Sequence, residues 1–210
     1  MRRRRFRVVL RVANCEGVSE SHPEHEARLA LTKPGEYGDP DVVAFSEVSW
    51  CDVAAVARRY ADEFTVVQHG ERGSPEAGVG IAARDGIAAL GSVIGSRPTG
   101  EGGGIRLRPI VGAEKDGEDW WAVHPPPPRA PNARREYFKR ARPCRGIVAG
   151  DWNRPPWWMR ATSVRNYRGI GVLGVLVPRR VRAGRARPVD IGSDHPAVDV
   201  PLWIKERRRA

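Results

Sequence analysis

Several short apolar runs in this chain end in acids and amides, residues able to bind a cation or to act as a base. Asp151 and Asn153 follow one such run in the stretch GIVAGDWN, and Asn14 and Glu47 follow two earlier ones. Strands rarely end in such residues without a reason, and binding sites gather where strand ends meet at the rim of a sheet. The pattern predicts that these side chains converge.

Two imidazoles complete the set. His124 follows a run that stops before four prolines, and Asp194 and His195 directly precede the last apolar run. The acids and amides would together form a hard-oxygen cation site, the kind Mg²⁺ prefers, and the imidazoles would lie beside it. Each residue also has a purely structural alternative, because Asn and Asp are common in turns and Glu47 favours a helix start. Their shared position at strand ends favours the functional interpretation.

The elements that must position these residues are mostly strands. Apolar runs of about four to eight residues between turn residues predict strands at 6–13, 42–45, 64–68, 78–83, 105–111, 120–123, 147–149, 171–177 and 197–203. Helices are predicted in PEHEARLALTKP, CDVAAVARRYADEF and APNARREYFKRARP, and Asn132 is the predicted N-cap of the last one. Residues 95–105 are predicted to form a flexible connector. The mixed order favours an α+β or layered α/β fold. We expect one domain over residues 1–210, with short basic extensions at both ends.

The charge distribution points to a polyanionic partner. The net charge is +11, and residues 129–189 contain 16 Lys and Arg against two acids, so the rest of the chain sums to −3. A basic segment on a near-neutral body is typical of nucleic-acid binding, although arginine on a solvated surface explains it equally well. Three widely spaced cysteines indicate reduced thiols, and no secretion signal or transmembrane run is evident. We therefore expect a soluble cytoplasmic protein without a membrane partner.

Six stretches, taken in order, resemble the endonuclease/exonuclease/phosphatase superfamily, which includes deoxyribonuclease-like and AP-endonuclease-like enzymes. They are RVVLRVANCEG, DVVAFSEV, GVGIAAR, WWAVHPPPP, GIVAGDWN and IGSDHPAVDV, and they cover nearly the whole chain. GDWN and SDH in this order are the specific ones. The resemblance implies a four-layer α/β/β/α sandwich of two packed mixed sheets, here in a compact version, and a metal-dependent phosphoesterase.

The resemblance also implies the role of each residue. Glu47 would be the main Mg²⁺ ligand, with Asn14 and Asp194 nearby, and Mn²⁺ is a possible substitute. Asp151 would orient or deprotonate the attacking water, and Asn153 would hold a phosphate oxygen. His195 would hydrogen-bond the scissile phosphate, and His124 would do the same or protonate the leaving oxygen. Apart from the resemblance, the position of Arg154 and Arg160 after the proposed phosphate site suggests that they contact the substrate, and Trp152 would either stack on a base or pack in the core.

The chain departs from the family pattern at three places: a minor one at Ser46, the loss of an Asp, and a short spacing of about seventeen residues between Asn153 and the predicted strand that follows. Ser46 stands where the family usually has Gln before the metal-binding Glu. The Asp of the family's Ile-Asp pattern is replaced by Gly171 or Val172, so His195 lacks its usual carboxylate partner. Asp190 and Asp199 are the available substitutes.

Three functions follow from these observations. The leading one is a Mg²⁺-dependent DNA endonuclease or nuclease, because phosphodiester hydrolysis needs a metal, a carboxylate base and phosphate donors. The second is a phosphatase or phosphodiesterase acting on a small phosphorylated substrate. The third is a basic nucleic-acid-binding protein whose hydrolase site is impaired, which the missing carboxylate motivates.

Overall fold

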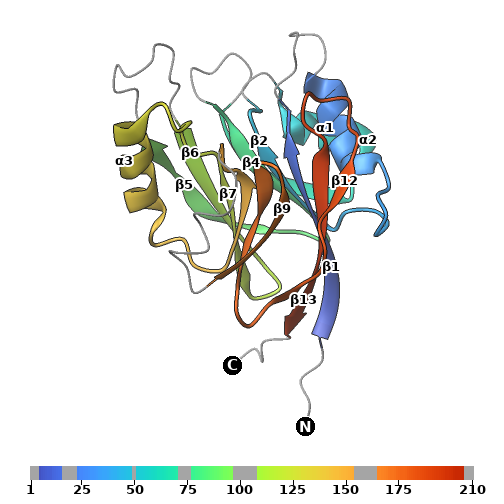
Figure 1. The fold of residues 1–210 in the computed structure, drawn as a ribbon. Helices are drawn as coiled ribbons and strands as arrows, with labels where there is room; N and C mark the ends of the chain where they lie inside the picture. The colour runs from blue at the N-terminus through green and yellow to red at the C-terminus, as the bar shows by residue number, and fades with distance from the viewer. Residues whose placement is uncertain are drawn as a thin grey trace.

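Two β-sheets packed face to face form the centre of the molecule, with helices on both outer faces (Figure 1). The structure is a computed structural model that describes residues 5–15, 23–48, 51–70, 77–96, 108–153 and 165–205. The α+β sandwich and its layer order α/β/β/α confirm the fold class expected from the sequence. Both chain ends lie at the lower end of the sandwich in Figure 1, and β1 runs from there toward the upper end.

Seven of the described strands form the first sheet, in the order β11-β13-β1-β2-β4-β3, with β12 also paired to β13. β1 and β2 are parallel, and β13 is antiparallel to β1. The bounds are β1 Arg5–Asn14, β2 Val42–Ser46, β3 Phe64–His69, β4 Val79–Arg84, β11 Arg182–Ala183, β12 Arg187–Val189 and β13 Ala197–Lys205.

Six described strands form the second sheet, in the order β5-β6-β7-β8-β10-β9. β7 and β8 are parallel, and the other neighbours in this sheet are antiparallel. The bounds are β5 Ala88–Ser96, β6 Arg108–Lys115, β7 Glu118–Val123, β8 Ile147–Asp151, β9 Arg165–Ile170 and β10 Leu173–Pro178. Each sheet therefore contains one parallel pair, and these two pairs position the site described below.

Three apolar layers hold the sandwich together. In β2, Val42 and Ala44 pack between the sheets, while Val43 and Phe45 pack outward under the helices α1 and α2. Such a strand is buried on both faces, so its sequence is a continuous apolar run. The third layer lies between the second sheet and α3, around Tyr137. The helices are α1 Pro23–Thr32, α2 Val53–Tyr60 and α3 Pro131–Ala141.

The structure corrects three details of the predicted elements. The predicted strand at 171–177 is β10 but begins only at Leu173, because the chain turns at Gly171 with φ 56°, and the preceding strand β9 was not predicted. The start of the predicted connector at 95–105 belongs to β5, and residues 97–107 lie outside the described part. The N-cap of α3 is Ala130 with Pro131 behind it, so Asn132 is not the cap; proline is well suited to a first helical turn.

The three cysteines are free and buried, as their spacing predicted. Burial raises the pKa of the Cys15 thiol, with further contributions from Glu26 and Cys51. Among the helices of the described residues, none has the length and apolar character needed to cross a membrane.

Candidate active site

The carboxyl ends of the two parallel strand pairs meet at one edge of the sandwich. Asn14 at the end of β1 lies opposite Ser46 at the end of β2, and Asp151 ends β8 in the other sheet. The Asn14 Nδ2 donates to Asp151 Oδ2 at 3.0 Å, and the Asp151 amide donates to the Ser46 hydroxyl at 3.1 Å. All three residues are buried. These two bonds join the sheets through polar groups where apolar packing would otherwise be expected.

Both oxygens of the Asp151 carboxylate are held in place. Oδ2 accepts from the Asn14 side chain, and Oδ1 accepts from the backbone N–H of Asn153 at 2.7 Å. Asn153 adopts a left-handed backbone (φ 54°), which Asn tolerates, and its Nδ2 donates to the Pro125 carbonyl at 2.9 Å. The Asp151 carboxylate therefore has one fixed orientation, which is what a base that must face a bound water requires.

Gly150 explains why the strand reaches Asp151 in this position. A Cβ at residue 150 would lie 1.8 Å from the carbonyl oxygen of Val123 in the parallel strand β7. A glycine in a strand often marks such a close backbone approach. The Gly before Asp in GDWN thus serves the packing of β8 on β7, and through it the position of the carboxylate.

Glu47 and His124 are in direct contact. Glu47 Oε1 lies 3.0 Å from Nε2 of His124, which is fully buried at the end of β7. Glu47 has a left-handed backbone (φ 57°), an uncommon state for a residue with a long side chain, and such backbone strain clusters at functional sites. His124 therefore contacts the Glu47 carboxylate from a buried position, and its predicted role on the phosphate or leaving oxygen stays a prediction.

Arg108 of β6 is a site residue that sequence reasoning missed. Its Nη1 lies 2.6 Å from Nδ1 and 2.8 Å from Nε2 of His124, and 3.5 Å from Oε1 of Glu47. The only sequence signal was a charged residue in the predicted strand at 105–111, a position that strand patterning alone assigns to solvent. A guanidinium here gives the site a fixed positive charge beside its main carboxylate.

Residues of α3 fix the backbone that carries His124. The His124 amide donates to the Tyr137 hydroxyl at 2.9 Å, and that hydroxyl donates to the Pro109 carbonyl at 3.2 Å. Burial raises the pKa of Tyr137, so its hydroxyl keeps its proton. The buried Arg134 donates to the carbonyls of Pro126 and Trp152. The segment of consecutive prolines is therefore anchored to the site and not a free spacer.

Asp194 and His195 lie at the same edge but outside this hydrogen-bond network. β13 pairs with β1 so that Val198 lies opposite Val12, and continuing that register places Pro196 opposite Asn14. Both side chains are about half exposed, and His195 Nε2 lies 3.7 Å from Asp194 Oδ2. His195 is therefore beside the end of β1 and accessible to a ligand.

Neither substitute for the missing carboxylate partner of His195 is available. Asp199 is fully buried and pairs with Arg11 at 2.7 Å. Asp190 accepts from the Gly192 amide at 2.9 Å, and this bond and the charge of Lys33 lower its pKa. The structure thus gives His195 no carboxylate other than its neighbour Asp194 among the described residues.

Of the predicted substrate contacts, Trp152 lies within the described residues. The Trp152 ring is buried against the α3 layer, and its Nε1 donates to the Gly174 carbonyl at 3.0 Å. It is therefore a packing residue whose ring is not available to stack on a base. Arg154 and Arg160 lie outside the described residues.

Glu26 of α1 is a buried acid that sequence reasoning did not single out. It is 2% exposed, and its Oε2 is buried and has no hydrogen-bond partner among the residues that the structure describes. Burial, with a contribution from the Asp194 carboxylate, raises its pKa from 4.5 to about 7. Its only sequence signal was an acidic first turn, which is ordinary for a helix.

We expect Glu26→Gln to stabilise the protein above pH 7. A raised pKa means that the folded state binds the proton more tightly than the unfolded state, so wild-type stability falls as the pH rises from 4.5 to about 7. The amide removes this loss, and the gain is on the order of 1–3 kcal/mol, the usual cost of an unsatisfied buried polar group. Urea unfolding in EDTA across this range measures it. A slope of stability against pH equal to that of the wild type would contradict the assignment.

The donor types at this edge fit a hard divalent cation. Glu47 supplies a partly exposed carboxylate next to the amide-bearing Asn14, and Mg²⁺ needs only one or two protein carboxylates because water and phosphate complete its shell. Within the described ranges, no three His, Cys, Asp or Glu side chains form a closed metal-binding group. Glu47 and Asn14 are therefore the described residues whose donor types would suit such a cation.

Comparison with solved structures identifies the fold. TDP2 from D. rerio, in a structure described as complexed with a single-strand DNA product, superposes with a TM-score of 0.63 at 16% identity over 93% of this chain and 98% of that one. An endonuclease/exonuclease/phosphatase protein from Beutenbergia cavernae gives 0.64 at 16% identity, over 97% and 72%. The catalytic domain of human Nocturnin, with a bound sulfate, gives 0.58 at 11%, over 94% and 96%. No protein-family model and no curated protein matches the sequence.

Proposed function

We propose that this chain, which has the fold of the endonuclease/exonuclease/phosphatase superfamily, is a Mg²⁺-dependent phosphodiester hydrolase acting on DNA. One observation carries the proposal: the Asp151 carboxylate is held through both oxygens at the edge where the two sheets join. A folding role does not require this arrangement, because apolar residues would seal the same edge at lower desolvation cost. The neighbours with this fold are consistent with phosphoester chemistry.

The residues of this chain divide the reaction among them. Asp151 orients a water and accepts its proton as the water oxygen attacks phosphorus, and the bond to the leaving oxygen breaks. Asn153 and His195 donate to the non-bridging oxygens, and amide or imidazole donors stabilise the charge that develops there. Glu47, with Asn14 and Asp194, would hold the cation, which when bound offsets negative charge on the phosphate. His124 and Arg108 hold Glu47 in the orientation it needs.

DNA is the substrate favoured by the charge of the protein. The net charge of +11 attracts polyanions, and α3 presents four exposed cations close to the elements of the site: Arg135, Lys139, Arg140 and Arg142. The D. rerio TDP2 structure described as a complex with single-strand DNA product adds a precedent on the same fold.

Cleavage of DNA with and without Mg²⁺ tests the proposal. We expect the protein to cleave a supercoiled plasmid or a labelled single-stranded oligonucleotide with Mg²⁺ and to lose this activity in EDTA. Because Glu47 is the main proposed ligand, Glu47→Gln should raise the Mg²⁺ concentration for half-maximal rate by about 10–100-fold. The matched control Glu63→Gln, which removes an exposed carboxylate paired with Arg84, should leave it unchanged.

Two results would replace the proposal by one of its alternatives. Faster turnover of a small phosphodiester than of DNA, at equal phosphate concentration, would identify a small-molecule phosphoesterase. DNA binding without cleavage of either substrate at any Mg²⁺ or Mn²⁺ concentration would identify a non-catalytic nucleic-acid-binding protein.

A further inference from the structure

The segment at 165–187, which contains β9 to β12, is strongly basic. It contains seven arginines and no Asp, Glu or Lys. This is a large share of the basic segment at 129–189, which brackets Asp151 in sequence. In space, only part of it lies near the site. The turn between β9 and β10 does, because Leu173 lies opposite Asp151, whereas β10 then runs away from that edge and β11 and β12 belong to the first sheet.

Among the side chains that the structure describes, two of these arginines pair with carboxylates elsewhere in the chain. Arg180 donates to both oxygens of the buried Glu118, which raises the arginine's pKa, and Arg187 lies 3.0 Å from Glu36. Four other arginines of the segment are exposed and form no ion pair within the described part of the chain. We call these the arginine surface: Arg168, Arg179, Arg182 and Arg185. The surplus charge is thus concentrated and not used for internal pairing.

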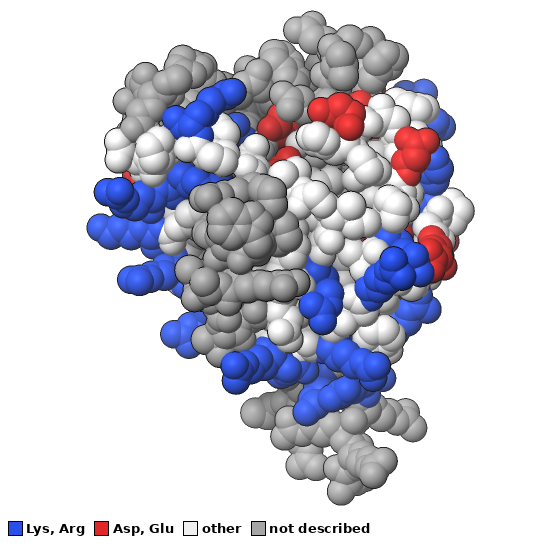
Figure 2. Space-filling model, in the orientation of Figure 1, with Lys and Arg blue, Asp and Glu red and all other residues white. Residues whose placement is uncertain are grey.

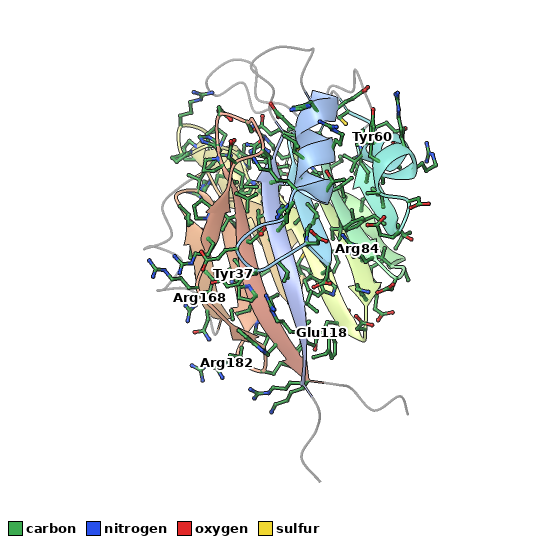
Figure 3. The ribbon with its side chains drawn as sticks, turned by 90° about the vertical axis from the view of Figure 1, so that its right-hand side faces the viewer. Tyr37, Tyr60, Arg84, Glu118, Arg168 and Arg182 are labelled. Carbon is green, nitrogen blue, oxygen red and sulfur yellow. The ribbon has the colours of Figure 1, made fainter. Side chains whose placement is uncertain are left out.

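The arginine surface is held on rigid elements along one flank. Arg182 lies on β11 opposite Trp203 of β13, and Arg168 lies on β9, an edge strand that contacts β12 and β13. Figure 3 shows both side chains directed outward along the same flank. In the face drawn in Figure 2, the lower part shows Lys and Arg side chains and no carboxylates. A surface of one charge sign on fixed backbone is able to follow a polyanion.

The chemistry of these side chains suits phosphate. All four are arginines, whose planar guanidinium groups match phosphate oxygens with two parallel N–H donors. The Arg182 guanidinium lies 5.4 Å from the centre of the Trp203 ring, so the ring fixes its plane while its N–H groups stay at the edge. The Arg185 carbonyl accepts from the Tyr37 hydroxyl at 2.9 Å, which fixes the backbone at that position.

The arginine surface extends away from the candidate active site. Arg168 is its nearest described member, because it lies opposite Val175, which lies opposite Ala149, two residues before Asp151. Arg182 is farther away: it shares Trp203 as cross-strand neighbour with Arg7, which lies seven residues before Asn14 on β1. At about 3.3 Å per residue, the strand places Arg182 on the order of 20 Å from Asn14. A single phosphodiester in the site does not reach Arg182, whereas a polymer several nucleotides long does.

We propose that the arginine surface is a nucleic-acid-binding surface distinct from the catalytic pocket, which binds the phosphate backbone without reading sequence. This inference concerns binding and is independent of whether the pocket hydrolyses phosphodiesters. Its physical basis is the release of counterions from phosphates that the guanidinium groups neutralise.

Removal of three of these charges tests the proposal. The variant Arg168→Gln/Arg179→Gln/Arg182→Gln is compared with a control, Arg28→Gln/Arg58→Gln/Arg59→Gln, which removes the same charge from α1 and α2. Binding of a labelled DNA duplex is measured by fluorescence anisotropy in EDTA as a function of salt. Each lost phosphate contact lowers the magnitude of the slope of log K against log salt by about 0.9. For the first variant this magnitude should therefore be about 3 smaller than for the wild type. The control should keep that slope.

Two results would overturn the inference. One is an unchanged slope in the first variant, or an equal loss in the control. The other is binding of polyglutamate as tight as that of DNA of equal charge, which would indicate an acidic protein partner. Turnover of bis(p-nitrophenyl) phosphate checks that the pocket of each variant is intact. If the wild type turns over no phosphodiester, the proposed function fails, and the salt slopes still decide the arginine surface.

Discussion

Asp151→Asn should lower the rate of DNA cleavage by about 10²–10⁴-fold, the usual contribution of a positioned general base. The amide cannot accept a proton from water at neutral pH. It also replaces one acceptor by a donor, so one of the two N–H groups that now bind the carboxylate, from Asn14 or Asn153, loses its partner. Steady-state cleavage in saturating Mg²⁺ measures the effect, and DNA binding should persist because the basic surfaces are unchanged.

A matched control separates the base from general charge effects. Glu136→Gln removes a carboxylate that is half exposed and paired with Arg140 on α3. It changes the net charge by the same amount and should leave the rate within about twofold, because exposed ion pairs of this kind contribute about 0.3–0.5 kcal/mol. A folded Asp151→Asn protein with more than a tenth of the wild-type rate would show that another group is the base.

Asp199→Asn should destabilise the protein by about 3–5 kcal/mol, the usual cost of leaving one member of a buried ion pair alone. Arg11 and Asp199 are both fully buried and bind through two bonds of 2.7 and 2.8 Å. Arg11 also donates to the carbonyls of Ala30 and Lys33, where α1 ends and its carbonyls have no helical partner. The pair thus joins β1, β13 and α1, and its loss affects all three.

Urea unfolding measures this loss, and the slope of the unfolding free energy against urea concentration should be the same in the variant and the wild type. Arg11→Met/Asp199→Leu should recover part of it, because replacing a buried pair by apolar residues avoids the uncompensated charge. Glu63→Gln, at the partly exposed Arg84 pair, should cost at most about 1 kcal/mol. A loss in Asp199→Asn no larger than in this control would mean that water or another group replaces the carboxylate.

The residues of the candidate site that lie at strand ends were predictable from the sequence. A strand that is buried on both faces must be apolar throughout, so Asn14, Glu47, His124 and Asp151 stood out where their strands stopped. Parallel strands end at the same edge, which the β1–β2 and β7–β8 pairs confirm. Whether Asp194 and His195 contact a substrate with them stays a prediction.

Other features depend on partners that are distant in sequence. Arg108 became a site residue only because β6 lies beside β7, and Trp152 became a packing residue because its indole reaches the Gly174 carbonyl. Ser46, which looked like a minor departure from the family pattern, joins the two sheets through the Asp151 amide. In each case the contact crosses from one strand to another, and a local pattern carries no record of it.

By itself, the sequence determined the α+β class, most of the strands and helices, and the set of acids, amides and imidazoles at their ends, because these depend on burial and backbone propensity over a few residues. The tertiary structure decided which of those side chains touch, that His124 contacts Glu47, that Asp199 pairs with Arg11, and that the surplus arginines extend along one flank away from the pocket. These depend on the pairing and packing of strands tens of residues apart, where position is set by the whole sandwich and not by neighbouring residues.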